Sequence, residues 1–570
     1  MSAESPFVER FPSEARIVRL NLGVAFIALF IGGLFGAIQS LHRTGVYRGL
    51  IQSSDYYSML TAHGVLLALV FTTFFIAGLF HWGITRSFDR NAPSQWFSMT
   101  WFGVMLLGTV LATIAILGGL IPFAPDDLNA AVLYTFYAPM KAHPLFYIGA
   151  ALLIVGSWLA GADWFWSYFR WRKTNSDERI PLQAFMVLVT WLMWYLATLG
   201  VATEVVVFLI PWSLGIIPAV DPLLTRTLFW FFGHPVVYFW LLPAYFVWYT
   251  ILPKLSGGRL VSDPLARVSF VLFLLLSTPV GFHHQYLDPG IAEGFKFIAM
   301  SNTMFLLLPS LLTAFTVVAS MEHGARQRGG KGLLGWLRAL PWDEPAFAGV
   351  ALAGLMFAAG GFSGMVNAGM NLNYLVHNTQ WVPGHFHLTV GTAAALTFMA
   401  ISYWLVPQVT GKRLQLKGLA IVQPYLWFLG MTLMSNAMHR SGLAGVPRRT
   451  AEPEWNAVSG IAYETIVGSF QETQLQIAVG GVLLFVSVVL FSMVMFGTFL
   501  VRADLGPIRV SGSLPRPLST AEDGPLVLDN LRLWFTIAVV LVAIAYGPPF
   551  FDMISDGVFW PGTPPTTSGL

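Results

Sequence analysis

The sequence predicts an all-α membrane protein, a polytopic bundle of about thirteen transmembrane helices. Of the 570 residues, 56% are hydrophobic and only 10% are charged, whereas soluble domains carry about 25% charged residues. The apolar residues form runs of roughly 20, the length that a helix needs to cross the hydrocarbon core of a bilayer. The chain has no cysteine, which excludes thiolate-ligated copper and iron–sulfur clusters within it. With a net charge of +3, carried mostly by loops, no nucleic-acid partner is expected.

The expected spans organise the chain as one membrane domain over residues 1–570. We predict a cytoplasmic N-terminal tail at 1–16, the helical bundle at 17–550 and an extracytoplasmic C-terminal tail at 551–570. The polar N-terminus lacks the apolar core and cleavage site of a signal peptide, so we expect it to be retained. The spans are expected near 17–41, 56–82, 96–121, 143–165, 183–211, 224–252, 266–287, 297–321, 346–369, 380–406, 417–438, 472–500 and 527–550.

Lysine and arginine orient this bundle. They are concentrated on one side, for example in the loops 170–181 and 322–344, and the positive-inside rule places that side in the cytoplasm. The N-terminus is then cytoplasmic as well. The odd-numbered spans run outward and the even-numbered spans run inward.

Half of the 12 histidines lie inside these spans, where an ionisable side chain is a functional hypothesis by default. In the expected orientation, all six fall in the outer half of the bilayer and come from four different helices. Imidazole is a ligand for iron and for copper. The similar depth of the six histidines in the bilayer therefore predicts a metal centre. The six residues are His63, His234, His283, His284, His385 and His387.

The spacing of these histidines adds detail. His385 and His387 are two residues apart, so at about 100° per residue they project on nearly opposite faces of one helix. That helix could hold two cofactors, or carry two polar residues at a helix–helix contact. His234 and Tyr238 share a face at i and i+4, which also suits a simple hydrogen bond in a core. His283 and His284 complete a set of three imidazoles, which suits copper with an open position.

The motifs around these residues are GHPVVYFW, STPVGFHHQ and NTQWVPGHFHL. Over nearly the whole chain, the pattern resembles subunit I of the haem–copper oxygen reductases, and these motifs look like the B family typified by the thermophilic bacterial cytochrome c oxidase. The resemblance implies a proton-pumping terminal oxidase that reduces O₂ to water in a bacterial or archaeal cell (inner) membrane. The A family carries a glutamate at the position of Val236, so the resemblance implies the type with one proton channel.

The resemblance also assigns roles to individual residues. His63 and His387 would be the axial ligands of a low-spin haem b, and His385 the proximal ligand of a high-spin haem of the a type. His234, His283 and His284 would hold the copper called CuB. Tyr238 would be covalently joined to His234 and donate an electron and a proton during O–O cleavage.

A proton route from the cytoplasm is a further expectation. Tyr238, Tyr245 and Tyr249 can share one helical stripe, and Ser310 and Thr313 lie near mid-membrane on the eighth span. Together they resemble the family's K-type pathway. Hydroxyl side chains also commonly hydrogen-bond across packed helices without carrying protons, so this alternative stays open.

The outer loops contain candidate partners for haem propionates. Arg448 and Arg449 resemble the family's propionate partners, since paired guanidiniums suit carboxylates; an ordinary pair of loop charges is the alternative. His377 is expected near the same propionates. Asn373 stands where the thermophile-type enzyme has an aspartate, and its amide cannot take up a proton as that carboxylate could.

The resemblance implies partners for the chain besides O₂ and membrane lipid. CuA needs thiolates, so a subunit II with a cupredoxin domain would carry it and accept electrons from cytochrome c; a small single-helix subunit would complete the complex. Quinol is the alternative donor.

Two other functions are the alternatives to the oxidase. A nitric oxide reductase shares the six histidines but typically lacks the tyrosine and carries glutamates near its non-haem iron. Here Glu204 is the only carboxylate expected deep in a span, and the sequence assigns it no role. A non-catalytic cytochrome b or haem-transport protein would not need His234, His283 and His284. The other histidines, including His81, are interpreted as ordinary residues of span ends and loops.

Overall fold

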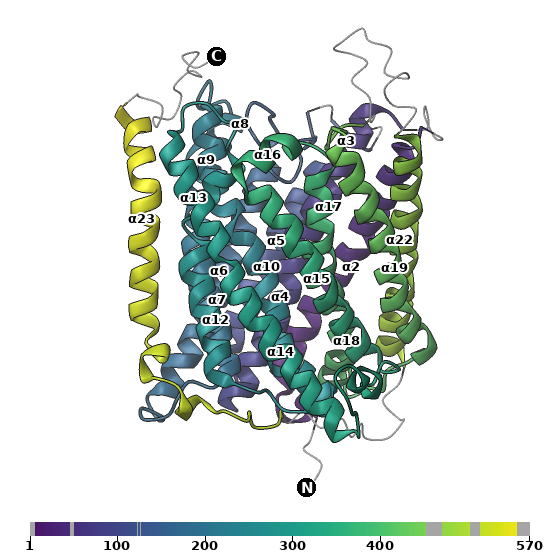
Figure 1. The fold of residues 1–570 in the computed structure, drawn as a ribbon. Coiled ribbons are helices and arrows are strands. Elements are labelled where there is room, and N and C mark those ends of the chain that lie inside the picture. Colours follow the sequence, from purple (N-terminus) through teal and green to yellow (C-terminus); the bar gives the residue numbers. More distant parts are fainter. Residues whose placement is uncertain are drawn as a thin grey trace.

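The computed structural model describes residues 6–45, 51–121, 123–125, 127–451, 470–501 and 514–555. Over these residues the chain is a bundle of long helices (Figure 1) without strands, and the β-type pairing that it contains consists of isolated bridges. Twelve helical segments in the described part are long and apolar enough to cross a membrane. Exposed side chains on these segments include Ile27, Phe315 and Phe362, as a lipid-facing surface requires. The prediction of a multi-pass membrane bundle is confirmed.

The helices follow the expected order along the chain. Those up to residue 255 are α1 (Phe7–Arg10), α2 (Pro12–His42), α3 (Ser53–Gly64), α4 (Thr72–Phe88), α5 (Gln95–Gly118), α6 (Pro144–Arg172), α7 (Leu182–Thr203), α8 (Ile210–Ser213), α9 (Pro222–Gly233), α10 (Pro235–Thr250) and α11 (Leu252–Leu255). Those after it are α12 (Asp263–Ser277), α13 (Glu293–Phe305), α14 (Leu307–Gln327), α15 (Pro345–Ala368), α16 (Met370–Val376), α17 (Trp381–Leu388), α18 (Ala395–Thr410), α19 (Lys417–Leu443), α22 (Gln471–Leu500) and α23 (Leu531–Ser555).

Three π-helical segments and four short 3₁₀ segments interrupt or join these helices. The π segment η1 begins two residues after His63, and η5 begins two residues after His387; π-bulges are frequent at functional sites. The third π segment, η2, begins at Glu204. The segments are η1 (Val65–Phe71), η2 (Glu204–Leu209), η3 (Gly281–His284), η4 (Gly335–Ala339), η5 (Thr389–Ala394), η6 (Ala521–Asp523) and η7 (Leu526–Asp529).

The seventh expected span, 266–287, differs from the prediction. Its helix α12 covers only Asp263–Ser277, 15 residues, or about 22 Å at the usual rise, which is short of the hydrocarbon thickness. Pro279 interrupts it because proline has no backbone N–H to donate to a carbonyl oxygen of the preceding turn. The chain then forms the 3₁₀ segment η3, so His283 and His284 lie on a tight turn and not on the end of a long helix.

The N-terminal segment packs against the bundle. Helix α2 begins at Pro12, inside the segment 1–16 that we expected to be a tail, and Phe7 and Phe11 are buried. Glu14 is fully buried and accepts a 2.5 Å hydrogen bond from Nε2 of His81. His81 is therefore not the ordinary span-end residue that we expected, because it forms a buried pair between α2 and α4.

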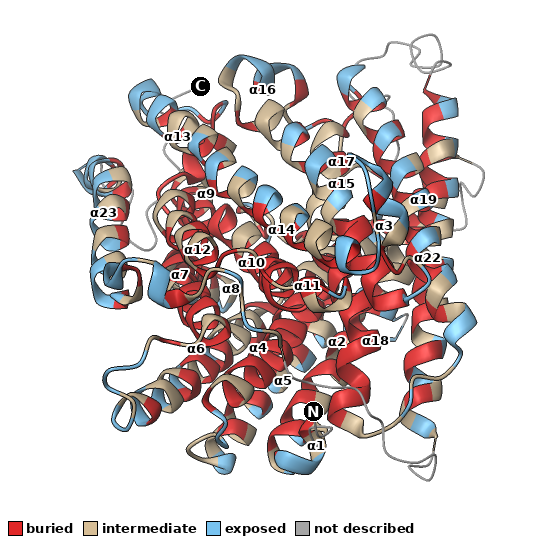
Figure 2. Ribbon diagram, turned by 60° about the horizontal axis from the view of Figure 1, so that its bottom comes forward, coloured by how far each residue is buried: buried red, intermediate tan, exposed pale blue. Residues whose placement is uncertain are grey.

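The helices that follow His63, His234 and His387 along the chain lie centrally in the bundle. Figure 2 shows α4, α10 and α18 almost entirely buried, whereas α23 stands at the edge with exposed residues. Helix α23 continues to Ser555, five residues beyond the expected end at 550. Residues 556–570 of the expected C-terminal tail lie outside the described part.

Candidate metal centre

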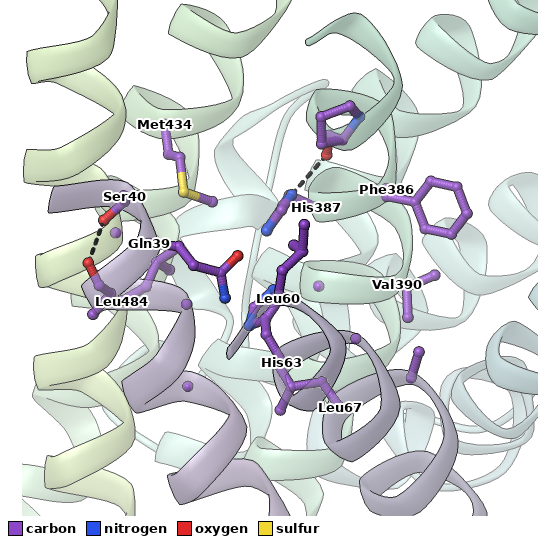
Figure 3. A pocket seen from close by; sticks show the side chains of 18 of the residues that line it. Gln39, Ser40, Leu60, His63, Leu67, Phe386, His387, Val390, Met434 and Leu484 are labelled. Carbon is purple, nitrogen blue, oxygen red and sulfur yellow. Dashed lines mark hydrogen bonds between the residues drawn. The ribbon is translucent and has the colours of Figure 1, made fainter. Parts of the chain in front are cut away.

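The first pair of histidines faces across a cavity between α2, α3 and α17. The rings of His63 and His387 point toward one another (Figure 3), with centroids 6.2 Å apart and planes inclined by 21°. Nδ1 of His63 lies 2.9 Å from the carbonyl oxygen of Gly32, and Nδ1 of His387 lies 2.7 Å from that of Pro383. Carbonyl oxygens can only accept, so each Nδ1 carries the proton and each Nε2 keeps its lone pair for a metal.

This geometry fits a haem iron with two axial imidazoles. A metal–imidazole bond is about 2 Å long, so two opposed nitrogens lie about 4 Å apart around one metal. Adding the half-width of each ring brings the centroids close to the observed separation. The cavity around the pair measures about 290 Å³ and is lined mainly by apolar side chains, with Arg448 and Arg449 at one part of its wall. That lining suits a flat apolar ring with charged substituents at one edge.

Gly36 provides a test of this pair. A Cβ at Gly36 would lie 2.7 Å from both Cε1 and Nδ1 of His63, so Gly36→Ala should displace the imidazole. We expect about tenfold less low-spin haem in the purified protein, as is usual when the support of a ligand is disturbed, measured from the reduced optical spectrum. Gly23→Ala on the same helix is the control, because its Cβ would meet nothing within 4 Å. Equal haem content in both variants would contradict the assignment.

His385 belongs to a second cavity. Its Nδ1 lies 3.0 Å from the carbonyl oxygen of Gly360 and 3.0 Å from Oγ of Ser363, so this imidazole too presents Nε2 as a free ligand. The second cavity measures about 170 Å³. Phe386 lies between His385 and His387 in sequence and lines both cavities. The prediction that one helix serves two sites on opposite faces is thus consistent with the structure.

The other three histidines meet in the second cavity. One possible ligand atom from each of His234, His283 and His284 lies within 4.8 Å of the other two. Nδ1 of His234 is 3.2 Å from Nε2 of His284, and Oγ1 of Thr303 is 2.9 Å from Nδ1 of His283. The ring of His284 stacks on Trp230, with centroids 3.8 Å apart. Three neutral imidazoles that converge in this way fit a copper ion with an open position.

Tyr238 lines the same cavity. Its ring centroid is 5.2 Å from that of His234, and Nε2 of His234 is buried without a hydrogen-bond partner in the described structure. The covalent bond between these two residues stays a prediction.

A chain of hydroxyl groups approaches the second cavity along α10 and α14. Tyr249 Oη donates to Oγ1 of Thr313 at 2.7 Å and lies 2.9 Å from Oγ of Ser269. Tyr245 Oη is 3.4 Å from Oγ of Ser310, which lines the cavity together with Tyr238. The expected pathway residues therefore lie together. Ser269 of α12 was missed, because an isolated serine in an apolar span carries no sequence signal.

One wall of the two cavities is rich in positive charge. Arg448 lines both cavities and donates to Oδ1 of Asn378 at 3.0 Å, while Arg449 lies over the rings of Tyr134 and Tyr137. In the described part of the chain neither guanidinium pairs with a carboxylate. Burial and the neighbouring Arg449 lower the pKa of Arg448 to about 9. Such uncompensated cations fit the carboxylates of haem propionates.

His377 and Asn373 form a pair beside these arginines. Nδ1 of His377 lies 3.0 Å from Oδ1 of Asn373, whose Nδ2 donates to the carbonyl oxygen of Asn367. Burial, together with the charge of Arg448, lowers the pKa of His377 to about 4. The imidazole is therefore neutral near pH 7 and donates to the amide oxygen.

Comparison with known proteins decides the family. The family described as Cytochrome C and Quinol oxidase polypeptide I matches residues 16–483. The chain belongs to this family. It is 43% identical over 559 residues to cytochrome c oxidase subunit 1 of Thermus thermophilus, covering 96% of each chain. It is 26% identical over 417 residues to cytochrome c oxidase polypeptide 1 of Halobacterium salinarum, covering 70% of this chain and 66% of that protein.

A solved structure agrees with this assignment. The chain is similar, with a TM-score of 0.87 and 36% identity over 97% of this chain and 96% of the other, to a structure titled "Cryo-EM structure of a heme-copper terminal oxidase dimer provides insights into its catalytic mechanism". The chain is thus a catalytic subunit of a haem–copper oxygen reductase, and subunit I of a multi-subunit complex. The family implies haems and copper, and the three converging imidazoles are compatible with CuB.

Glu204 has no assigned place in this site. It is fully buried and neither carboxylate oxygen has a hydrogen-bond partner in the described structure. It is not the only buried carboxylate in a span, because Asp163 of α6 is also fully buried and accepts from Ser98 and Trp101.

Proposed function

We propose that the two cavities hold a low-spin haem b and a high-spin haem of the a type with CuB. His63 and His387 would ligate the first haem, His385 the second, and His234, His283 and His284 the copper. When bound, the high-spin haem and the copper supply the redox chemistry that reduces O₂ to water. The observation that carries the proposal is the convergence of three imidazoles in the cavity that also contains His385 and Tyr238.

The residues of the second cavity would control the protons of this reaction. Tyr238 would hold a proton on Oη beside the copper ligands, within the cavity that Ser310 also lines. The pairs Tyr249–Thr313 and Tyr245–Ser310 would pass protons toward Tyr238 from the side of the membrane opposite to Arg448 and Arg449. Since the side with more Lys and Arg is cytoplasmic by the positive-inside rule, the N-terminus would be cytoplasmic and the protons would enter from the cytoplasm.

Proton pumping and electron donation complete the proposal. Arg448 and Arg449 would bind haem propionates, with His377 and Asn373 beside them. Because the amide of Asn373 cannot take up a proton, pumped protons would have to be held by another group in this region. The electron donor would be cytochrome c, acting through a subunit II with a CuA cupredoxin domain, since this chain has no cysteine for CuA. A small single-helix subunit would be a further component.

Metal analysis and spectroscopy of the purified complex test this function. We expect two haem irons and at least one copper for each copy of this chain. The reduced optical spectrum should change on addition of carbon monoxide for one haem only, because the other has two axial ligands. Iron without copper would contradict the proposal and favour a nitric oxide reductase or a haem carrier. Turnover with a quinol but not with cytochrome c would contradict the proposed donor alone.

A further inference from the structure

The last helix, α23, lies outside the part of the chain that the family match covers. The match ends at residue 483, and α23 covers Leu531–Ser555. Figure 1 shows this helix standing at one side of the bundle, where it packs against α12 and α7. Its position suggests an accessory element, but one of its side chains reaches the segment that carries two of the proposed copper ligands.

That side chain is Tyr546. Its phenol oxygen accepts a 2.9 Å hydrogen bond from the backbone N–H of Gly281, the first residue of η3. The ring is 2% exposed and packs against Phe231 and Phe282, with centroids 4.6 Å and 4.8 Å away. Tyr546 therefore contacts the elements on both sides of the copper site, α9 before His234 and η3 with His283 and His284.

The η3 segment needs this support. The first N–H groups of a short helix have no acceptor within it, and a buried N–H without a partner is unfavourable. The next local bond, from the N–H of His283 to the carbonyl oxygen of Val280, is long at 3.4 Å. The contact is also closely fitted, because a Cβ on Gly281 would lie 2.3 Å from the phenol oxygen of Tyr546 and 2.2 Å from the carbonyl oxygen of Trp230.

The other end of α23 is held in place by charge. Asp529, just before the helix, pairs with both Arg179 and Arg267, and Arg267 is fully buried and also pairs with Asp263 of α12. Residues 518–519 add backbone hydrogen bonds to Leu260 and Val261. These contacts fix the height of α23 along α12. Tyr546, about four turns further along, is thereby held at the level of η3.

We propose that Tyr546 is a positioning residue for the copper site: α23 holds η3 so that His283 and His284 face His234. The proposal rests on the proposed copper site. It predicts that a helix beyond the family match affects how firmly copper is bound, without touching the metal.

The test compares Tyr546→Phe with the wild-type complex. Phenylalanine keeps the ring packing and removes only the acceptor of the Gly281 N–H. We expect hydrogen exchange in the peptide that contains Gly281 to become roughly tenfold faster, the upper range for one buried hydrogen bond. We also expect faster loss of copper to a chelator, and a shifted infrared stretch of carbon monoxide bound to copper after photolysis. The haem absorption bands should not change.

Tyr195→Phe is the matched control. It also removes a phenol that bonds to backbone between two helices, since Tyr195 donates to the carbonyl oxygen of Trp158 at 2.7 Å. Among the described residues, Tyr195 makes no hydrogen bond or ring contact with η3. Slow exchange in peptides of α23 would show that the helix stays docked in Tyr546→Phe.

The outcomes separate the two proposals. If the wild-type complex contains no copper, the proposed function is overturned. Hydrogen exchange of the peptide with Gly281, compared between Tyr546→Phe and the wild type, would still show whether Tyr546 holds η3 in place. Wild-type complex with copper, together with unchanged exchange and copper loss in Tyr546→Phe, would overturn the positioning role alone.

Discussion

Replacing Tyr238 with phenylalanine should reduce O₂ turnover by roughly 10³-fold or more, within the range of lost proton-donor function, while both haem spectra stay largely intact. The phenol lies in the cavity of the proposed copper ligands and of His385. Phenylalanine keeps the packing against Phe273, whose ring centroid is 5.3 Å away. The variant therefore removes the hydroxyl, and with it the predicted covalent bond to His234, while it keeps the ring packing. Polarographic O₂ consumption by the purified complex measures the effect.

Tyr403→Phe is the control for this experiment. Tyr403 is also a buried tyrosine, but its hydroxyl donates to Oε1 of Gln423 between α18 and α19, and it lines neither cavity. We expect this variant to keep its turnover. Near-normal turnover of Tyr238→Phe would reject Tyr238 as the donor.

The membrane bundle could be predicted because hydropathy is a property of single segments. The expected spans match the twelve long helices to within a few residues at most ends. The seventh span shows the limit of this reasoning. Its composition is mostly apolar from Phe270 to Val280, but Pro279 ends the regular helix, and the rest of the segment forms a turn around His283 and His284.

The metal ligands could be located because a histidine in an apolar span is costly unless it has a function. Their supporting residues could not. Gly36, Ser363 and Thr303 contact the imidazoles only because helices distant in sequence pack together, and small residues of these types are common in membrane helices. The same limit applies to Tyr546, which lies 265 residues from its partner Gly281.

The buried pair of Glu14 and His81 shows a different limit. Both residues lie near span ends, where charged and polar side chains usually reach water, so composition gave no reason to pair them. The structure buries this end of the bundle because α1 packs against α2 and α18, with Phe7 and Phe11 buried and the ring of Phe7 beside that of Trp82, the residue after His81. The burial of a residue near the end of a span therefore cannot be predicted from the sequence where a short segment packs over that end.

Thr313→Val should slow turnover by on the order of 10²-fold, the lower range for a lost step of proton transfer. The hydroxyl of Thr313 accepts from Tyr249 at 2.7 Å and donates to the carbonyl oxygen of Pro309 within its own helix. Valine has nearly the same shape but cannot relay a proton. We expect reduction of the low-spin haem by the donor to proceed at its normal rate, while proton uptake, followed with a pH-indicator dye, becomes slow.

The control for Thr313→Val is Thr316→Val, one turn further along α14. Thr316 is equally buried and also donates to a carbonyl oxygen of its own helix, that of Leu312, and Tyr249 does not bond to it, so this variant should keep its turnover. Because Tyr249 also bonds to Ser269, the route through Ser269 has to be closed in the same experiment. Ser269→Ala combined with Thr313→Val should be slower than Thr313→Val alone. Normal turnover in the double variant would show that protons reach Tyr238 without passing Tyr249, and the chain of hydroxyls along α10 and α14 would then be only a set of interhelical hydrogen bonds.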